Sequence, residues 1–343
     1  MTHRQKLGVA LVLLAAFQLL IVFAGFFAPY GFATQDRKRP FAAPTTLHFR
    51  DAQGHFHLRP FILESESSEV RAGADVLDAR QVYPVRFFVD GAPYKIAGII
   101  PAHTHLFGVE QPGRIFLMGS DAYGRDQFSR FLFGGQISLL AGLIAAMLSV
   151  SIGILMGGIA GYYGGWVDEL LMRGGELFLA LPWLYLLFAV RAALPLHISQ
   201  WEVFLLLVSV MGLIGWARPA RLIRGVVLSA KQRSFVMAAR GFGASDAYLL
   251  RRHVLPQTYG VLLTQMTLLI PQFVLAEVTL TFLGLGVGEP LPSWGTQLAS
   301  LQQYYVLSSY WWMFLPALLL IPLFLVFYTA ADALQELYKT VTL

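Results

Sequence analysis

Six long apolar stretches divide this sequence, and their length constrains the fold more than any other feature. They run over residues 7–28, 138–162, 170–194, 201–216 or slightly beyond, 259–285 and 310–331. A helix needs about 20 apolar residues to cross a bilayer, and only helices and closed barrels satisfy their backbone hydrogen bonds in lipid. The sequence therefore predicts an all-α polytopic membrane protein with six transmembrane helices. Pro182 predicts a kink in the third of them.

The first apolar stretch follows two cations, Arg4 and Lys6. A cleaved signal peptide would have an apolar region of about 7–15 residues that ends at a small-residue cleavage site. The stretch from Leu7 to Ala28 is longer than that. We therefore interpret residues 1–29 as a cytoplasmic N-terminus and an uncleaved first transmembrane helix.

Residue types and motifs that the sequence lacks exclude several classes of site. The chain has no cysteine, which excludes disulfides, zinc thiolate sites and a cysteine nucleophile. No GxxxxGK[ST], HExxH or GxSxG motif occurs in it. We therefore expect no enzyme, no cofactor or metal site, and no nucleic acid as a partner.

Residues 30–136 form a more polar region between the first two spans, and we expect a small mixed extracytoplasmic insertion there. Twelve of the chain's 25 Lys and Arg residues lie between positions 35 and 136, mixed with acids. Two apolar runs, 82–89 and 92–99, flank Asp90-Gly91. This pattern predicts a β-hairpin with a two-residue turn.

Two histidine pairs in the insertion have the spacing of metal ligands on an extended strand. They are His55 with His57 and His103 with His105. No acid or third histidine is placed to complete a set, so we interpret them as solvated surface histidines.

Positive charge in the short loops predicts the orientation in the membrane. Segment 217–257 carries eight Lys and Arg residues, whereas the loop over 286–309 carries none. Cytoplasmic loops are enriched in these residues, and long loops translocate largely regardless of charge. We therefore place segment 217–257 and both termini in the cytoplasm and residues 30–136 outside. Residues 137–343 would form a five-helix core.

Within the basic segment, residues 235–256 are too polar to span a membrane and predict two short helices. Gly241 and Gly243 end the first helix, and Ser245 can cap the second, with Asp246 in its first turn. Pro256 is expected to break the helix before the fifth span. An ordinary basic loop near anionic headgroups is the alternative. The helix–glycine–helix–proline layout is more than headgroup attraction requires, so it favours a docking surface for a partner.

This segment resembles the signature loop of ABC importer permeases, A-A-x-x-x-G followed after nine residues by an apolar-type position, one residue and Leu-Pro. The matching positions are Ala238, Ala239, Gly243, His253, Leu255 and Pro256. Residues 117–130, LMGSDAYGRDQFSR, and 281–295, TFLGLGVGEPLPSWG, are similar to two motifs of the dipeptide/oligopeptide/nickel branch. The resemblance covers about 117–300 and the sixth span, and it points to the C-type subunit. One departure is Met237, which stands where the family has a glutamate.

The resemblance implies one subunit of an ATP-driven importer of peptides or related small solutes in the bacterial inner membrane. A homologous second permease, two cytoplasmic ATPases and an extracytoplasmic solute-binding protein would be its partners, with membrane lipid around the spans. The ATPases would drive alternating access through the coupling loop, residues 235–256. Gly124, Arg125 and Asp126 would have an outer-gate or structural role.

Two acids lie within apolar spans, Glu176 in the third and Glu277 in the fifth. Such acids usually face a pathway or a partner, so both are candidates for the pathway or a subunit interface. Glu277 could instead be a helix-end acid that reaches water near the outer surface. For the whole chain, the alternative is an ion-coupled secondary carrier without an ATPase partner. A carrier commonly has an internal repeat, and we find none in the sequence.

Overall fold

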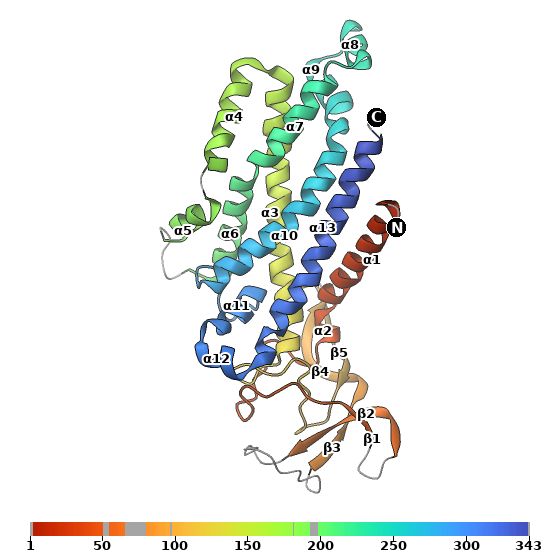
Figure 1. The fold of residues 1–343 in the computed structure, drawn as a ribbon, viewed down its shortest axis with the longest axis vertical. Helices are drawn as coiled ribbons and strands as arrows, with labels where there is room; N and C mark the ends of the chain where they lie inside the picture. The colour runs from red at the N-terminus through yellow and green to blue at the C-terminus, as the bar shows by residue number, and fades with distance from the viewer. Residues whose placement is uncertain are drawn as a thin grey trace. The chain divides into compact units, whose positions relative to one another are not determined.

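The computed structural model of the protein describes residues 3–50, 55–65, 80–96, 98–180, 182–192 and 198–341. The chain forms two compact units, shown as a ribbon in Figure 1. The first unit comprises residues 1–15, 138–287 and 321–343. The second unit comprises residues 16–137 and 288–320.

Helices make up most of the described chain. The α-helices are α1 (His3–Val22), α2 (Ala24–Phe27), α3 (Gln127–Tyr163), α4 (Gly165–Ala180), α5 (Trp183–Ala192), α6 (Gln200–Gly215), α7 (Ala217–Ala230), α8 (Ser234–Gly241), α9 (Asp246–Leu249), α10 (Tyr259–Phe282), α11 (Trp294–Ala299), α12 (Tyr304–Ser309) and α13 (Leu315–Val341). A π-helical turn, η2 (Leu250–Val254), and three 3₁₀ turns, η3 (Leu255–Thr258), η4 (Ser300–Gln302) and η5 (Trp311–Phe314), extend or connect them.

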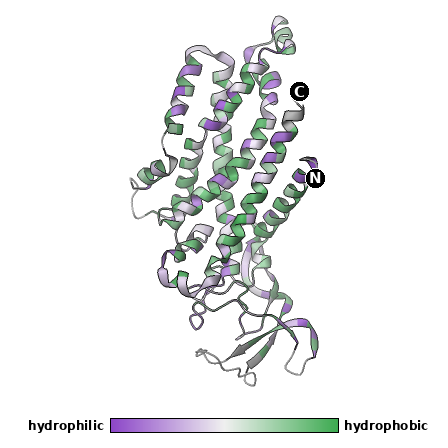
Figure 2. Ribbon diagram, in the orientation of Figure 1, coloured by the Kyte–Doolittle hydropathy of each residue, from purple (hydrophilic) through white to green (hydrophobic). Residues whose placement is uncertain are grey.

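Five helical segments of the described residues are long and apolar enough to cross a membrane, and a sixth span results if α4 and α5 count as one. Figure 2 shows hydrophobic residues along the long helices. The predicted fold class, a helical protein with membrane-length spans and a small sheet region after the first, is therefore confirmed. The third stretch differs in detail, because α4 and α5 are bent by 87° relative to each other. Pro182 lies directly before α5, so the predicted kink is a full break.

Small residues on α3 let its backbone approach α7 closely in the first unit. A Cβ atom on Gly153 would lie 2.7 Å from the Pro219 Cβ, and one on Gly161 would lie 2.8 Å from the Val227 Cβ. Glycine at these positions removes the side chains that would separate the two helices. The second half of α3 and α7 therefore pack as neighbours.

The strands of the second unit form two antiparallel sheets. One has the order β1 (His48–Arg50), β2 (Phe56–Ser65), β3 (Arg80–Pro84), and the other pairs β4 (Arg86–Ile96) with β5 (Ile100–Gly108). A hairpin is present, but the predicted turn at Asp90-Gly91 is wrong. These residues lie inside β4, where the register against β5 shifts between Asp90 and Tyr94. A glycine inside a strand often marks such an irregularity, and the actual turn follows Ile96.

One histidine of the two pairs, His105, is buried, so its interpretation as a solvated residue is wrong. The side chain of His105 is 1% exposed. Its ring nitrogens lie 2.6 Å from the Ala28 carbonyl oxygen and 3.0 Å from that of Ala92. A Cβ atom on Gly91 would lie 2.5 Å from the His105 ring, which explains the glycine at the irregularity in β4. His105 is thus part of the packing between β4 and β5.

Candidate functional site

The basic segment begins with α7 and folds back at the end of α8 through a left-handed glycine. Gly243 has a φ of +85°. Its N–H donates to the Arg240 carbonyl at 2.9 Å, and the Ala244 N–H donates to the Ala239 carbonyl at 3.2 Å. This is the Schellman pattern, which satisfies the last carbonyls of a helix and normally needs glycine at the left-handed position. The helix end predicted from the sequence is therefore present.

The two alanines of the signature face different surroundings. Ala238 is exposed, whereas Ala239 is half-buried and packs on a cluster of buried residues. Only Ala238 of this pair is available to an external partner. The resemblance assigned both alanines to the same loop signature, but consecutive helix positions do not share one face.

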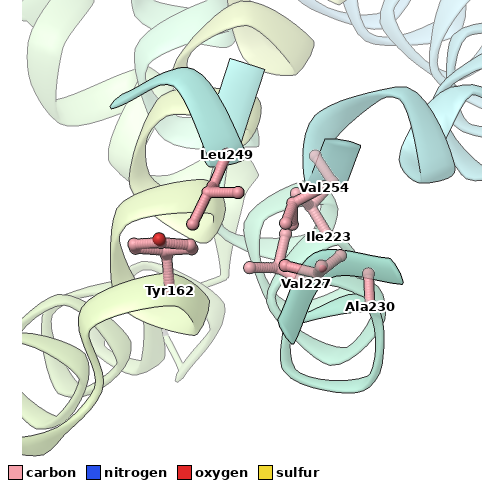
Figure 3. Packing of buried hydrophobic residues seen from close by; sticks show 7 residues of the cluster. Tyr162, Ile223, Val227, Ala230, Leu249 and Val254 are labelled. Carbon is pink, nitrogen blue, oxygen red and sulfur yellow. The ribbon is translucent and has the colours of Figure 1, made fainter. Parts of the chain in front are cut away.

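A small buried cluster holds the coupling loop on α3 and α7 (Figure 3). Its members are Tyr162, Ile223, Val227, Ala230, Val236, Leu249 and Val254. All of them are at most 6% exposed. They come from α3, α7, α8, α9 and the π turn, so the loop has its own core and is a folded platform.

The outer surface of this platform is apolar at its tip and cationic around it. Phe242, directly after α8, is 93% exposed, and Met237 is 61% exposed. Arg240, Arg251 and Arg252 are exposed as well. Together with Phe235, which is also exposed, Phe242 and Met237 put three large apolar side chains on one short segment, and a group of exposed apolar residues indicates a binding surface.

The end of the coupling loop corrects one prediction about Pro256. The helix was expected to break there, but residues 246–282 form one continuous helical segment. The π turn η2 is followed by the 3₁₀ turn η3, in which Pro256 lies in the first turn. A proline near the start of a turn loses no hydrogen bond that the turn needs, so the backbone stays helical.

The remaining two signature residues also serve the platform. Leu255 is half-buried and packs on the buried cluster. The His253 ring lies 5.5 Å from the Tyr248 ring and 6.1 Å from the Phe235 ring.

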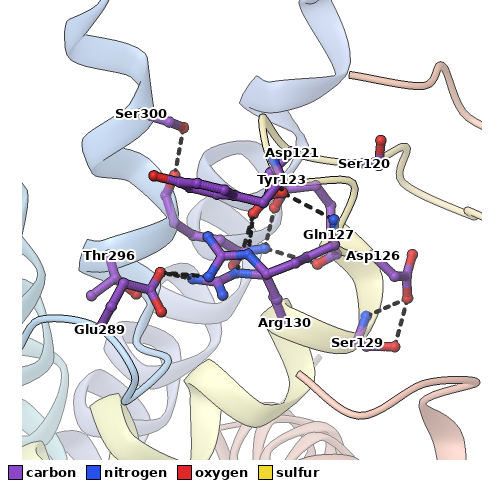
Figure 4. A network of polar contacts seen from close by, with 12 residues as sticks. Ser120, Asp121, Tyr123, Asp126, Gln127, Ser129, Arg130, Glu289, Thr296 and Ser300 are labelled. Atoms are coloured by element: carbon purple, nitrogen blue, oxygen red, sulfur yellow. Dashed lines mark hydrogen bonds and ion pairs between the residues drawn. The ribbon is translucent and has the colours of Figure 1, made fainter. Parts of the chain in front are cut away.

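A separate polar network lies at the start of α3 in the second unit (Figure 4). Asp126 accepts hydrogen bonds from the Ser129 N–H at 2.8 Å and from its hydroxyl at 2.6 Å. This bond to the third residue of the helix is the geometry of an N-cap. Asp126 is 3% exposed, and burial raises its pKa to about 6, although the hydrogen bonds from Ser129 lower it.

The turn before this cap is fixed by Asp121. One carboxylate oxygen accepts from the N–H groups of Tyr123 and Arg125, and the other pairs with Arg125 Nε at 2.7 Å. Gly124 has a φ of +70°, and a Cβ atom there would collide with the Asp36 carbonyl. The Gly124-Arg125-Asp126 motif is therefore a tight turn that leads into a capped helix.

Sequence reasoning missed Glu289, which joins this turn to the segment before α11. Its Oε1 lies 3.0 Å from Arg125 Nη1 and 2.8 Å from Arg130 Nη2. Arg130 is 2% exposed, and Glu289 is half exposed. The sequence did contain a signal for this contact, because Arg130 and Glu289 lie in the two motifs that are similar to the dipeptide/oligopeptide/nickel branch.

The two acids of the apolar spans have protein partners within the first unit. Glu277 is 1% exposed and accepts hydrogen bonds from Ser138 at 2.6 Å and Thr281 at 2.9 Å. It therefore joins α10 to α3, and in this chain it does not reach water. Glu176 is exposed on α4 and lies 3.6 Å from Arg221 Nη2 on α7. A pathway or subunit-interface role for either acid stays a prediction.

The fold and the site together define a polytopic helical membrane protein with an exposed, cationic two-helix platform between two of its spans. The family model described as "binding-protein-dependent transport system inner membrane component" matches residues 153–339. The chain belongs to this family of membrane components of ABC transport systems, whose catalytic ATPase is a different subunit. Such systems include ATPase and binding-protein partners.

Several curated relatives are similar over part of the chain. The dipeptide transport system permease protein DppC of Bacillus subtilis is 36% identical over 64% of this chain and 66% of its own length. The oligopeptide transport system permease protein OppC of the same species is 35% identical over 62% and 68%. The glutathione transport system permease protein GsiD of Pectobacterium atrosepticum is 33% identical over 66% and 73%. The chain thus matches about two thirds of the length of these relatives.

Among solved structures, the "crystal structure of an amino acid ABC transporter with histidines" is similar with a TM-score of 0.45 and 18% identity. The match covers 62% of this chain and 94% of that one. A superposition this loose adds nothing to the family assignment.

Proposed function

We propose that this chain is one of two transmembrane subunits of an ATP-driven importer, and that its cargo is a peptide or a related small solute. The curated relatives are named for transport of dipeptides, oligopeptides and glutathione, which supports a peptide-like cargo. A homologous second permease would complete the translocation path, and an extracytoplasmic binding protein would deliver the cargo.

The observation that carries the proposal is the exposed surface of the coupling loop. Phe242 and Met237 are exposed apolar residues of the same short segment that exposes Arg240, Arg251 and Arg252, and this segment packs on a buried cluster. An apolar anchor surrounded by charge is the usual arrangement of a binding hot spot, and cations favour an acidic rim on the partner. The partner is a cytoplasmic ATPase whose groove is apolar opposite Met237, because this chain has no acid there.

The proposed orientation has the coupling loop and both termini in the cytoplasm. Figure 1 shows α8 and the C-terminal end of α13 toward the same end of the helices of the first unit, which supports the cytoplasmic side proposed for the C-terminus. The insertion over residues 30–136 would then lie outside. It precedes the matched residues 153–339, so we assign it to contact with the binding protein or the second permease.

The same orientation gives the Gly124-Arg125-Asp126 turn a structural role at the outer end of α3. It caps the helix and, through Glu289, holds the segment before α11. Glu277 and Ser138 in turn join α10 to α3. These links keep the helices together while the coupling loop transmits motion from the ATPases to α7 and α10.

Co-purification tests the docking surface directly. The tagged chain, expressed with its neighbouring transport genes, should retain an ATPase. Phe242→Asp should reduce the retained ATPase strongly, because a carboxylate cannot enter an apolar pocket without a large desolvation cost. Leu58→Asp is the matched control, since Leu58 is 91% exposed on β2. Equal retention of the ATPase by both variants would contradict the proposed docking surface. Transport by the wild-type chain without any ATPase would support the ion-coupled carrier instead.

A second test uses Gly243→Asp in proteoliposomes. Aspartate tolerates a left-handed backbone better than most residues, and no atom lies within 4 Å of the position of its Cβ. The loop should therefore stay folded, with an added negative charge beside the docking surface. We expect transport and ATPase coupling to be lost while membrane insertion is unchanged. Normal transport by this variant would contradict the coupling role of the loop.

A further inference from the structure

The C-terminal end of α3 is bonded to the coupling loop by a single phenol group. Tyr162 donates its hydroxyl hydrogen to Asp246 Oδ1 at 2.6 Å. Arg240 Nη2 donates to the Tyr162 hydroxyl at 2.8 Å and to Asp246 Oδ1 at 3.2 Å. The Tyr162 hydroxyl therefore joins α3 to α8 and α9. Tyr162 and Asp246 are 84 positions apart in the sequence.

A lysine directly before the coupling loop also bonds to the end of α3. Lys231, between α7 and α8, donates from Nζ to the carbonyls of Gly161 at 2.8 Å and Tyr162 at 3.2 Å. These carbonyls belong to the last turn of α3, whose carbonyl groups lack partners within the helix. A cation at this end also complements the helix dipole. Lys231 thus caps the C-terminal end of α3 from the connection between α7 and α8.

Burial fixes the position of the Tyr162 hydroxyl. The side chain is 6% exposed and belongs to the buried cluster with Leu249 and Val227 (Figure 3). A Cβ atom on Gly161 would lie 2.9 Å from the Arg224 carbonyl oxygen, so α3 and α7 are in close backbone contact beside it. Closely packed elements of this kind move together, because the packing leaves no space for sliding.

We propose that Tyr162 is a positioning residue that makes α3 move with the coupling loop. The loop is continuous in sequence with α7 and α10 only, and the Tyr162 hydroxyl adds α3 as a third helix that receives the motion. α3, α7 and the coupling loop then turn as one block when the ATPases close. This role rests on the proposed function of the loop as an ATPase docking surface.

Tyr162→Phe tests the role, since it removes the hydroxyl and keeps the packed ring. The readout is ATP hydrolysis by the complete transporter in nanodiscs, with and without binding protein loaded with a peptide mixture. We expect the ratio of stimulated to basal ATP turnover to fall about threefold to tenfold. This is the size of effect expected when charge-assisted hydrogen bonds that are partly exposed to solvent are lost. The KM for ATP should not change, because the bond is remote from the nucleotide.

Tyr163→Phe is the matched control. It makes the same chemical change one residue later, where the side chain is 59% exposed. A ratio that falls equally in both variants, or in neither, would overturn the role of Tyr162. If the wild-type chain retains no ATPase, the proposed function is contradicted, and the role of Tyr162 with it. If the ATPase is retained but the ratio is unchanged in Tyr162→Phe, only the role of Tyr162 is contradicted.

A distance measurement tests the block without relying on turnover. The chain has no cysteine of its own, so spin labels attached at Tyr163→Cys and Ala247→Cys would be the only labels on it. We expect the same narrow distance distribution in the nucleotide-free and vanadate-trapped complexes when Tyr162 is intact, and a second distance in the trapped complex with Tyr162→Phe. A nucleotide-dependent change with Tyr162 intact would show that α3 moves separately and would overturn the inference.

Discussion

Arg224 on α7 donates to both carboxylate oxygens of Asp168 on α4, from Nε to Oδ1 and from Nη2 to Oδ2, the second at 2.5 Å. The residues are 56 positions apart, and the bidentate pair joins the two helices near the start of α4. The planar guanidinium matches both oxygens of the carboxylate, which lysine could not do.

Replacement of Asp168 with asparagine should therefore destabilise the chain. We expect Asp168→Asn to lower the free energy of unfolding by about 1–2 kcal/mol, because one oxygen of the pair is lost and the arginine is one-third exposed. Thermal unfolding in detergent measures the effect. Glu169→Gln is the control, since its pair with Arg173 is exposed on the same helix and should contribute at most about 0.5 kcal/mol. Equal effects of the two substitutions would contradict this assignment.

The two alanines of the signature should respond differently to the same substitution. Ala238→Leu adds volume on the exposed face, so we expect little change in thermal stability and weaker retention of the ATPase. Ala239→Leu adds volume against the buried cluster, and overpacking of this kind costs about 1–3 kcal/mol. Unfolding temperature and co-purification, measured on both variants, check the difference. The reverse pattern would mean that α8 presents its other face to the partner.

Gly243 and Gly241 form a second matched pair. Gly243→Val should destabilise the coupling loop by about 2 kcal/mol, since a β-branched residue is strained at a φ of +85°. Gly241→Ala should be neutral or stabilising by up to about 1 kcal/mol, because Gly241 is helical and has open space around it. Protection of α8 amides in hydrogen exchange measures both. Equal protection in the two variants would argue against strain at Gly243.

The stability of the second unit should depend on the protonation of Asp126. Its pKa is raised from 3.8 to about 6 in the folded protein, so the folded state binds the proton more tightly than the unfolded state. The resulting stabilisation is fully present below pH 3.8 and is lost as the pH rises through about 6. It amounts to about 3 kcal/mol at most, since one pKa unit corresponds to about 1.4 kcal/mol.

Asp126→Asn isolates this contribution. Asparagine also caps helices well and does not titrate. We expect the unfolding temperature of the variant, relative to the wild type, to rise as the pH increases from 4 to 7. A difference between the two proteins that does not change with pH over this range would show that Asp126 does not titrate there.

Local sequence patterns were reliable where a feature depends on neighbouring residues. The apolar stretches predicted the spans, and Gly243 predicted the end of α8, because span length and helix stops are properties of short segments. Asp90-Gly91 failed as a turn. A dipeptide cannot report that His105, fourteen residues after Gly91, needs the space beside that glycine. Pro256 failed as a break for a similar reason, since the π turn before it absorbs the shift in hydrogen bonding.

The sequence by itself determined that this chain is a membrane-spanning helical protein, that it carries a cationic platform between two spans, and that the platform resembles the coupling loop of a permease. These properties follow from length, charge and motif spacing along the chain. Only the tertiary structure decided that Ala238 faces outward and Ala239 inward, that Asp168 meets Arg224, and that the Tyr162 hydroxyl joins α3 to the loop. Such partners are far apart in sequence, and only the packing of the helices brings them within hydrogen-bond distance.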